Sequence, residues 1–84
     1  MPRFFFDIED VELRPDTEGL ELEGLNAARI AAVRFSGEVL ASTPDRFWTV
    51  GEWKCMVRDE RGLILFVLHF SAQDTPAAPR KVPR

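Results

Sequence analysis

The chain has 84 residues, a formal net charge of −3 and 45% hydrophobic residues, which limits it to one small domain. A domain of this size buries only about 60% of the surface that its unfolded chain exposes, so it usually needs a disulfide, a metal or a partner subunit. Cys55 is the only cysteine and His69 the only histidine, which excludes an internal disulfide and argues against a zinc site. We therefore expect no metal and no cofactor, and oligomerisation remains as the source of extra stability.

The charge is unevenly spread along the chain. Residues 7–23 contain eight acidic residues and one basic residue, a local charge of −7, which disfavours binding of nucleic-acid phosphates by the folded part. A lone cysteine is typical of a reducing compartment, and the N-terminus lacks the pattern of a secretory signal. No apolar run approaches the ~20 residues of a membrane span. We expect a cytoplasmic protein that does not bind membranes.

The first part of the chain predicts a hairpin with a long connection. Residues 3–9 alternate, with Phe4, Phe6 and Ile8 on one side, which is typical of a strand. Turn-forming residues follow in 10–19, and residues 20–23 alternate again as a short second strand.

Residues 25–41 are rich in helix formers and predict one helix. One face at 100° per residue collects apolar and small side chains, namely Leu25, Ala28, Ala32, Phe35, Ser36 and Val39. The small side chains on this face would let the helix lie close to a sheet. Thr43-Pro44 is expected to stop the helix, and residues 42–52 show too little periodicity to predict an element.

Two further strands are predicted at 53–58 and 63–70, separated by a tight turn at 59–62. The predicted fold class is therefore α+β with the order ββαββ, an antiparallel sheet of two hairpins with one helix packed on one face. Residues 1–72 would form the single domain, and residues 73–84 a flexible tail rich in proline and basic residues.

The two faces of the predicted sheet differ in composition. The face under the helix would carry Phe4, Phe6, Ile8, Trp53, Cys55, Val57, Ile64, Phe66, Leu68 and Phe70. The outer face would carry Asp7, Glu9, Lys54 and Arg58, together with the large apolar side chains of Phe5, Met56, Leu65 and Val67. Contiguous apolar patches often mark contact surfaces, so these four residues are a candidate interface for a homodimer or another protein, as is an exposed edge strand. The alternative is that they are ordinary scattered surface hydrophobes.

Arg29 lies at the border of the apolar helix face and is a candidate partner for Asp16 or Glu21 of the first hairpin. Such an ion pair would tie the acidic loop to the helix. The alternative is a surface arginine that packs its aliphatic stem and keeps its charge in water.

No residue pattern indicates catalysis. The acids of residues 7–12 lack the spacing of a calcium loop, and His69 has no nucleophile or carboxylate at a recognisable spacing. Cys55 and Trp53 fall in the inward register, whereas Trp48 lies in a segment expected to cover the core, although either tryptophan could stack on bases. We therefore expect no catalytic, cofactor-binding or metal-binding residues and no enzymatic activity.

Four segments, "MPRFFFDIED", "DTEGLEL", "LNAARIAA" and "WKCMVRDERGLILFVLHFSA", give the chain a resemblance to a known family over residues 1–72. It resembles short proteins of unknown function that are common in rhizobia and related alphaproteobacteria and often begin Met-Pro-Arg-Tyr-Phe-Phe. The matching positions are Arg3, Phe4, Phe5, Asp10, Asp16, Gly19, Glu21, Leu25, Ala27, Ala28, Arg29, Trp53, Val57, Gly62, Leu68 and Phe70. Val11 and Gly24 depart from the usual glycine and aspartate of the family. The resemblance implies a bacterial, cytoplasmic protein and implies no activity, cofactor or catalytic residue.

Two functions from different classes remain open. The first is a small non-enzymatic protein-interaction module, expected to be a homodimer or to bind another protein through its sheet. The second is a nucleic-acid-binding or toxin–antitoxin-like regulatory protein, in which Phe5 or Trp48 would stack on bases and the basic tail would add charge.

Overall fold

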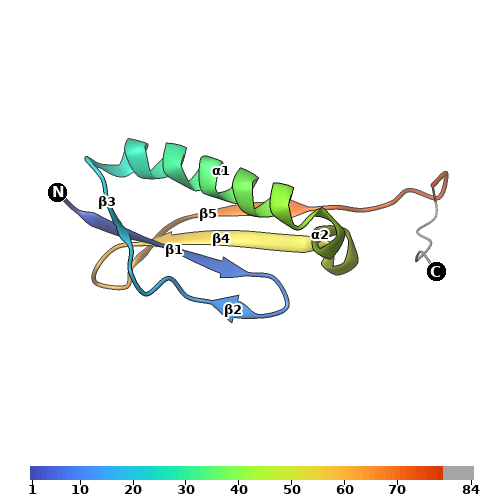
Figure 1. Cartoon of the computed structure of the whole chain (residues 1–84), viewed down its shortest axis with the longest axis horizontal. Coiled ribbons are helices and arrows are strands. Elements are labelled where there is room, and N and C mark those ends of the chain that lie inside the picture. Colours follow the sequence, from blue (N-terminus) through green and yellow to red (C-terminus); the bar gives the residue numbers. More distant parts are fainter. Residues whose placement is uncertain (79–84) are drawn as a thin grey trace.

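A computed structural model of the chain describes residues 1–78 as an antiparallel sheet with a long helix along one face and a short helix at one end of the sheet (Figure 1). The elements, in chain order, are β1 (Arg3–Glu9), β2 (Leu13–Arg14), β3 (Leu20–Glu21), α1 (Leu25–Ser42), α2 (Pro44–Val50), β4 (Glu52–Arg58) and β5 (Ile64–Ser71). The α+β class predicted from the sequence is thus confirmed. Residues 79–84, in the predicted basic tail, lie outside the described residues.

The strands are ordered β2-β1-β4-β5, and β3 also pairs with β1. β3 pairs antiparallel with Arg3 and Phe4 at the start of β1, whereas β2 pairs with Ile8 and Glu9 at its end. Two very short strands therefore share one edge of β1. The opposite edge of the sheet is the whole length of β5, which pairs with β4 on one side only among the described residues.

The predicted ββαββ order is wrong in detail, because two short elements were missed and one strand is shorter than expected. The second strand is only Leu20–Glu21, and Leu13–Arg14 forms an additional two-residue strand. The segment predicted to lack an element contains α2, which begins at Pro44 and ends before Gly51. Proline at the first helical position and glycine with φ 85° after the last are standard helix boundaries. Seven residues are too few to display a helical period.

The core lies between α1 and the central strands β1 and β4. Its buried apolar residues are Phe4, Phe6, Ala28, Ala32, Trp53, Cys55 and Val57. The third small residue of the helix face, Ser36, is also fully buried, and its hydroxyl donates a hydrogen bond of 2.7 Å to the Ala32 carbonyl. These short side chains bring the helix backbone close to the sheet, as the sequence pattern predicted.

A β-bulge changes which side chains of β5 face the core. Val57 pairs with Phe66 but Arg58 pairs with Ile64, so Leu65 is the extra residue of β5. As a result Leu65 packs against the core, whereas Ile64 is 54% exposed. The sequence assignment of these two residues to the faces of the sheet is therefore wrong, because strict alternation fails at a bulge.

Two glycines provide a matched test of the backbone. Gly19 has φ +74°, and a Cβ there would lie 2.9 Å from Phe5 Cε2 and 3.0 Å from the Phe4 carbonyl oxygen. Gly37 lies inside α1 with open space around it. We expect Gly19→Ala to lower the free energy of unfolding by about 1–3 kcal/mol and Gly37→Ala to raise it by about 0.5–1 kcal/mol. Urea denaturation of both variants is the measurement, and equal effects would contradict the close packing at Gly19.

Candidate functional site

The outer face of β1 carries a partly buried ion pair. Asp7 is only 8% exposed, and its Oδ2 accepts a hydrogen bond of 2.7 Å from Arg58 Nε. The Arg58 guanidinium also lies 4.5 Å from the centre of the Phe5 ring, within the range of a cation–π contact. Arg58 therefore covers both the charge of Asp7 and the ring of Phe5, two groups that the sequence placed on a solvated face.

Asp16 closes the edge of β1 between the two short strands. One of its carboxylate oxygens accepts the Phe6 N–H at 3.1 Å, and the other accepts the N–H groups of Glu18 and Gly19. Burial opposes ionisation of Asp16, but these donors outweigh it and lower the pKa of the carboxyl. A side chain thus takes the place of a strand partner for Phe6, and Arg58 also donates to the Asp16 carbonyl at 2.9 Å.

The ion pairs differ from those considered in the sequence. Glu21 lies 3.4 Å from Arg3, and Arg3 also donates to the Glu18 carbonyl. Arg29 is exposed on α1 and forms no ion pair with any of residues 1–78. The acidic loop is instead fixed to the sheet by Arg58, which lies on β4 rather than on the helix.

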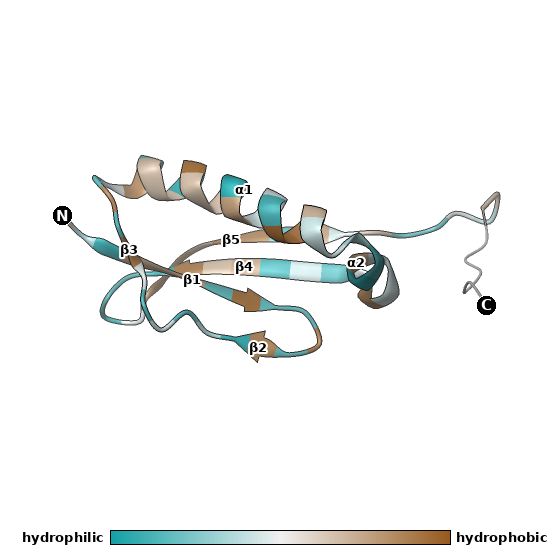
Figure 2. Ribbon diagram, in the orientation of Figure 1, coloured by the Kyte–Doolittle hydropathy of each residue, from teal (hydrophilic) through white to brown (hydrophobic). Residues whose placement is uncertain are grey.

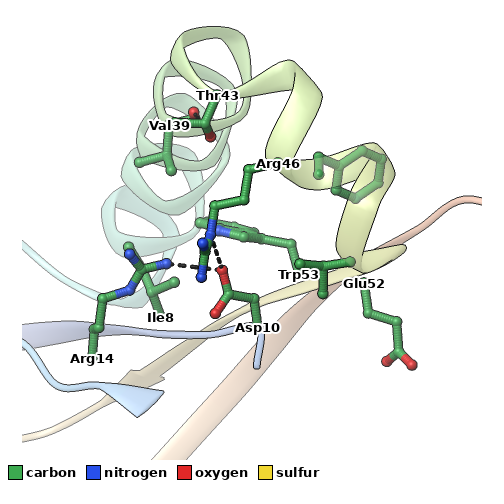
Figure 3. Close-up of a pocket in the computed structure, with 10 residues that line it drawn as sticks. Ile8, Asp10, Arg14, Val39, Thr43, Arg46, Glu52 and Trp53 are labelled. Carbon is green, nitrogen blue, oxygen red and sulfur yellow. Dashed lines mark hydrogen bonds and ion pairs between the residues drawn. The ribbon is translucent and has the colours of Figure 1, made fainter. Parts of the chain in front are cut away.

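A second buried carboxylate joins α2 to the end of β1 (Figure 3). The side chain of Asp10 is only 2% exposed, and it lies 3.0 Å from Arg14 Nη2 and 2.9 Å from Arg46 Nε. The hydrogen bond from Arg46 is the main cause that lowers the pKa of Asp10 to about 2. A carboxylate held ionised by two guanidinium groups is a poor proton acceptor at neutral pH, so we interpret this cluster as structural.

The free edge of β5 is defined by the hydrogen bonds of β4. The Ala72 N–H donates to the Gly51 carbonyl at 3.0 Å, in register with the β4–β5 ladder. Backbone groups of a strand alternate between its two sides. Phe66, Leu68 and Phe70 therefore direct their N–H and C=O groups toward β4, and the residues that direct them toward the free edge are Val67, His69 and Ser71.

The core-facing side of β5 is incompletely covered. Phe66, Leu68 and Phe70 pack against the core but are only half-buried, and apolar colouring continues along β5 and several turns of α1 (Figure 2). The reason is the position of α1, which approaches β4 more closely than it approaches β5. We call these three residues the β5 apolar strip.

The four candidate interface residues do not lie together on one open face. Phe5 lies under Arg58, and Leu65 packs against the core. Met56 is half-buried between its partners Asp7 and Val67 on neighbouring strands. Val67 alone is strongly exposed, at 46%, and it lies on the edge strand. The bulge and the Arg58 network, which depend on tertiary pairing, could not be recognised from alternation.

The remaining candidates occupy separate places. His69 Nε2 lies 3.1 Å from Glu52 Oε1 on the exposed outer face, and Cys55 is buried, which raises the pKa of its thiol to about 11. Trp53 is buried against the Phe70 ring, whereas Trp48 is half-exposed on α2. Residues 1–78 contain no group of three or more side chains placed to hold a metal ion, and no helix among them is long and apolar enough to cross a membrane.

The Asp10 cluster gives a prediction for acid pH. The carboxyl has a pKa of about 2 when folded against 3.8 as its ordinary value, so its contribution to stability is complete above pH 4 and is lost as the pH falls toward 2. We expect the free energy of unfolding to fall by about 2 kcal/mol over that range in the wild type and by less in Asp10→Asn. Urea denaturation at several pH values is the measurement, with Glu38→Gln as an exposed control. If the free energy of unfolding depended on pH as steeply in Asp10→Asn as in the wild type, the role of the cluster would be contradicted.

Comparison with known proteins gives one family. Curated proteins and solved structures yielded no match. The family model described as a domain of unknown function, DUF6894, matches residues 3–71, which span every strand and both helices. The chain therefore belongs to the DUF6894 family, whose function is unknown.

Proposed function

We propose that the protein is a small non-enzymatic protein-interaction module that self-associates through the open edge of β5. The observation that carries this proposal is an eight-residue edge strand with His69 as its only titratable side chain, lying beside the half-covered β5 apolar strip. A long, uncharged and apolar edge strand is a template for pairing with another strand.

Only one edge of the sheet invites such pairing within the described residues. The other edge consists of two strands of two residues each, and the Asp16 carboxylate occupies the Phe6 N–H between them. Very short strands and charged side chains are common means of blocking an edge. On the β5 side, Val67, His69 and Ser71 direct backbone groups outward, and no charged aspartate, glutamate, lysine or arginine lies on that strand.

A partner would also supply stability that the small core lacks. Seven apolar residues are buried in the described part of the chain, whereas the three residues of the β5 apolar strip remain half-buried. Covering them with a second subunit would remove further apolar surface from water at about 25 cal/mol per Å². We propose that this takes place in a bacterial cytoplasm, the setting that the family resemblance over residues 1–72 implies.

Nucleic-acid binding is the alternative, and the exposed ring of Trp48 is the observation in its favour. A stacking surface for bases normally has cations beside it to meet the phosphates. The adjacent Arg46 is engaged by Asp10 and Glu12, and Asp45 lies on the same short helix. These charges favour the interaction module over the alternative.

Self-association predicts a concentration-dependent dimer that edge charge disrupts. We expect the wild type to sediment as a dimer at micromolar concentration and Val67→Lys to raise the dissociation constant by about tenfold or more, because lysine on an edge strand opposes pairing. Leu63→Lys is the matched control, since Leu63 is exposed and lies just outside β5. A monomeric wild type, or equal effects of the two lysines, would overturn the proposal. Circular dichroism checks that both variants remain folded.

A further inference from the structure

We propose that the partner at this edge is one second copy of the chain, whose β5 pairs antiparallel with β5 about a two-fold axis at Leu68. Both α1 helices then lie on the same face of one continuous sheet. This inference rests on the proposed function and adds the arrangement of the two copies, their register and the residues that meet.

The backbone groups at the free edge restrict the register. With the axis at Leu68, Val67 of each copy lies opposite His69 of the other, and these are residues whose N–H and C=O groups point outward. Two such pairs can form four hydrogen bonds. An axis at Val67 would bring His69 opposite the bulged Leu65, and an axis at His69 would place two imidazoles face to face.

The same register matches apolar side chains on the helix-covered face. Phe66 of one copy lies opposite Phe70 of the other, and the two Leu68 side chains meet at the axis. Directly opposite side chains of antiparallel strands interact, and aromatic and aliphatic pairs stabilise sheets. The whole β5 apolar strip is thereby paired with its own counterpart.

In this dimer the distance between the two α1 helices would explain why β5 carries large side chains that its own helix leaves half-buried. Strands lie about 4.8 Å apart, so a helix seated over β4 stands about 14 Å from its symmetry mate across two β5 strands. Helices in direct contact lie about 8–10 Å apart, so this gap must be filled by side chains. Phe66, Leu68 and Phe70 from both copies lie at its floor.

One flank of α1 supplies the walls of this gap. Phe35 and Ala31 line a cavity with Phe6 and Ile8, so that flank faces β1. At 100° per residue, the opposite flank contains Val33, which is therefore on the β5 side. Leu25, Leu40 and the exposed Arg29 share this flank, and Val33 and Leu25 are 59% and 39% exposed. Arg29 can pack its aliphatic stem along the gap and keep its guanidinium in water.

This arrangement stops at two copies. Pairing about a two-fold axis uses the open edge of each copy, and the outer edges of the joined sheet are the two edges closed by β2, Asp16 and β3. Pairing β5 with the β1 edge of another copy would instead allow open-ended growth, and the closed edge opposes it.

A disulfide at the axis tests the register. Two residues that meet at a non-hydrogen-bonded antiparallel position have Cα atoms about 4.5 Å apart, within the range of a disulfide. Leu68 lies directly opposite Cys55 of its own chain, so the substitution is made together with Cys55→Ala to exclude an internal disulfide. We expect Leu68→Cys in this background to form a covalent dimer rapidly under mild oxidation. Cys55→Ala alone is the control, because it contains no cysteine. Val67→Cys, one residue from the axis, is expected to cross-link more slowly.

A pair of glutamates tests the helix flank. Val33→Glu would place charge beside the β5 apolar strip, whereas Ile30→Glu adds the same charge on the side of α1 turned away from the sheet, where Ile30 is 48% exposed. We expect Val33→Glu to raise the dimer dissociation constant by about tenfold or more and Ile30→Glu to change it by less than about threefold. Sedimentation velocity over a concentration series is the measurement.

The outcomes separate the two proposals. A dimeric wild type with fast Leu68→Cys cross-linking and a selective effect of Val33→Glu supports the arrangement. A dimeric wild type sensitive to Val67→Lys but lacking the Leu68→Cys cross-link, or equally affected by both glutamates, overturns the two-fold arrangement and leaves self-association at the edge standing. A monomeric wild type overturns both.

Discussion

One helix has to cover a sheet that is wider than itself. A helix with its side chains is about 10–12 Å across, which spans little more than two strands, whereas this sheet has four in its main order. Ala28, Ala32 and Ser36 seat α1 closely over β4. The distribution of burial over the sheet follows from that position, since β1 and β4 contribute the buried core while the β5 apolar strip is only half-buried.

The two edges of the sheet differ in whether another strand can pair with them. On the β1 side, the acidic segment folds back as two short strands, and the Asp16 carboxylate accepts the Phe6 N–H that lies between them. On the β5 side, eight residues run without a proline and without an aspartate, glutamate, lysine or arginine. The proposed closed pair depends on this asymmetry, because growth into a fibre would require pairing at both edges of each copy.

Three of the acidic residues in the segment 7–23 have a structural role. Asp7, Asp10 and Asp16 are each engaged by backbone N–H groups or by arginines, and Arg58 and Arg46 reach them from β4 and α2. Removing one partner from such a pair costs far more than the pair contributes, because it leaves a charge without compensation. These three aspartates therefore close one edge of the sheet and fix α2 to the end of β1.

The sequence by itself determined the strands near residues 3–9 and 53–58 and the helix near 25–41, because strong periodicity over six or more residues reflects burial on one side. It determined the strand near 63–70 through a continuous apolar run that follows a short turn, which favours a hairpin. It also determined the inward positions of Phe4, Phe6 and Trp53. Tertiary structure alone decided what covers Phe5 and which way Leu65 faces. Arg58, which covers Phe5, comes from a strand distant in sequence, and the bulge that turns Leu65 toward the core arises only when β4 and β5 pair. Tertiary structure also decided which edge stays open, because a free edge is a property of strand order, which no local pattern encodes.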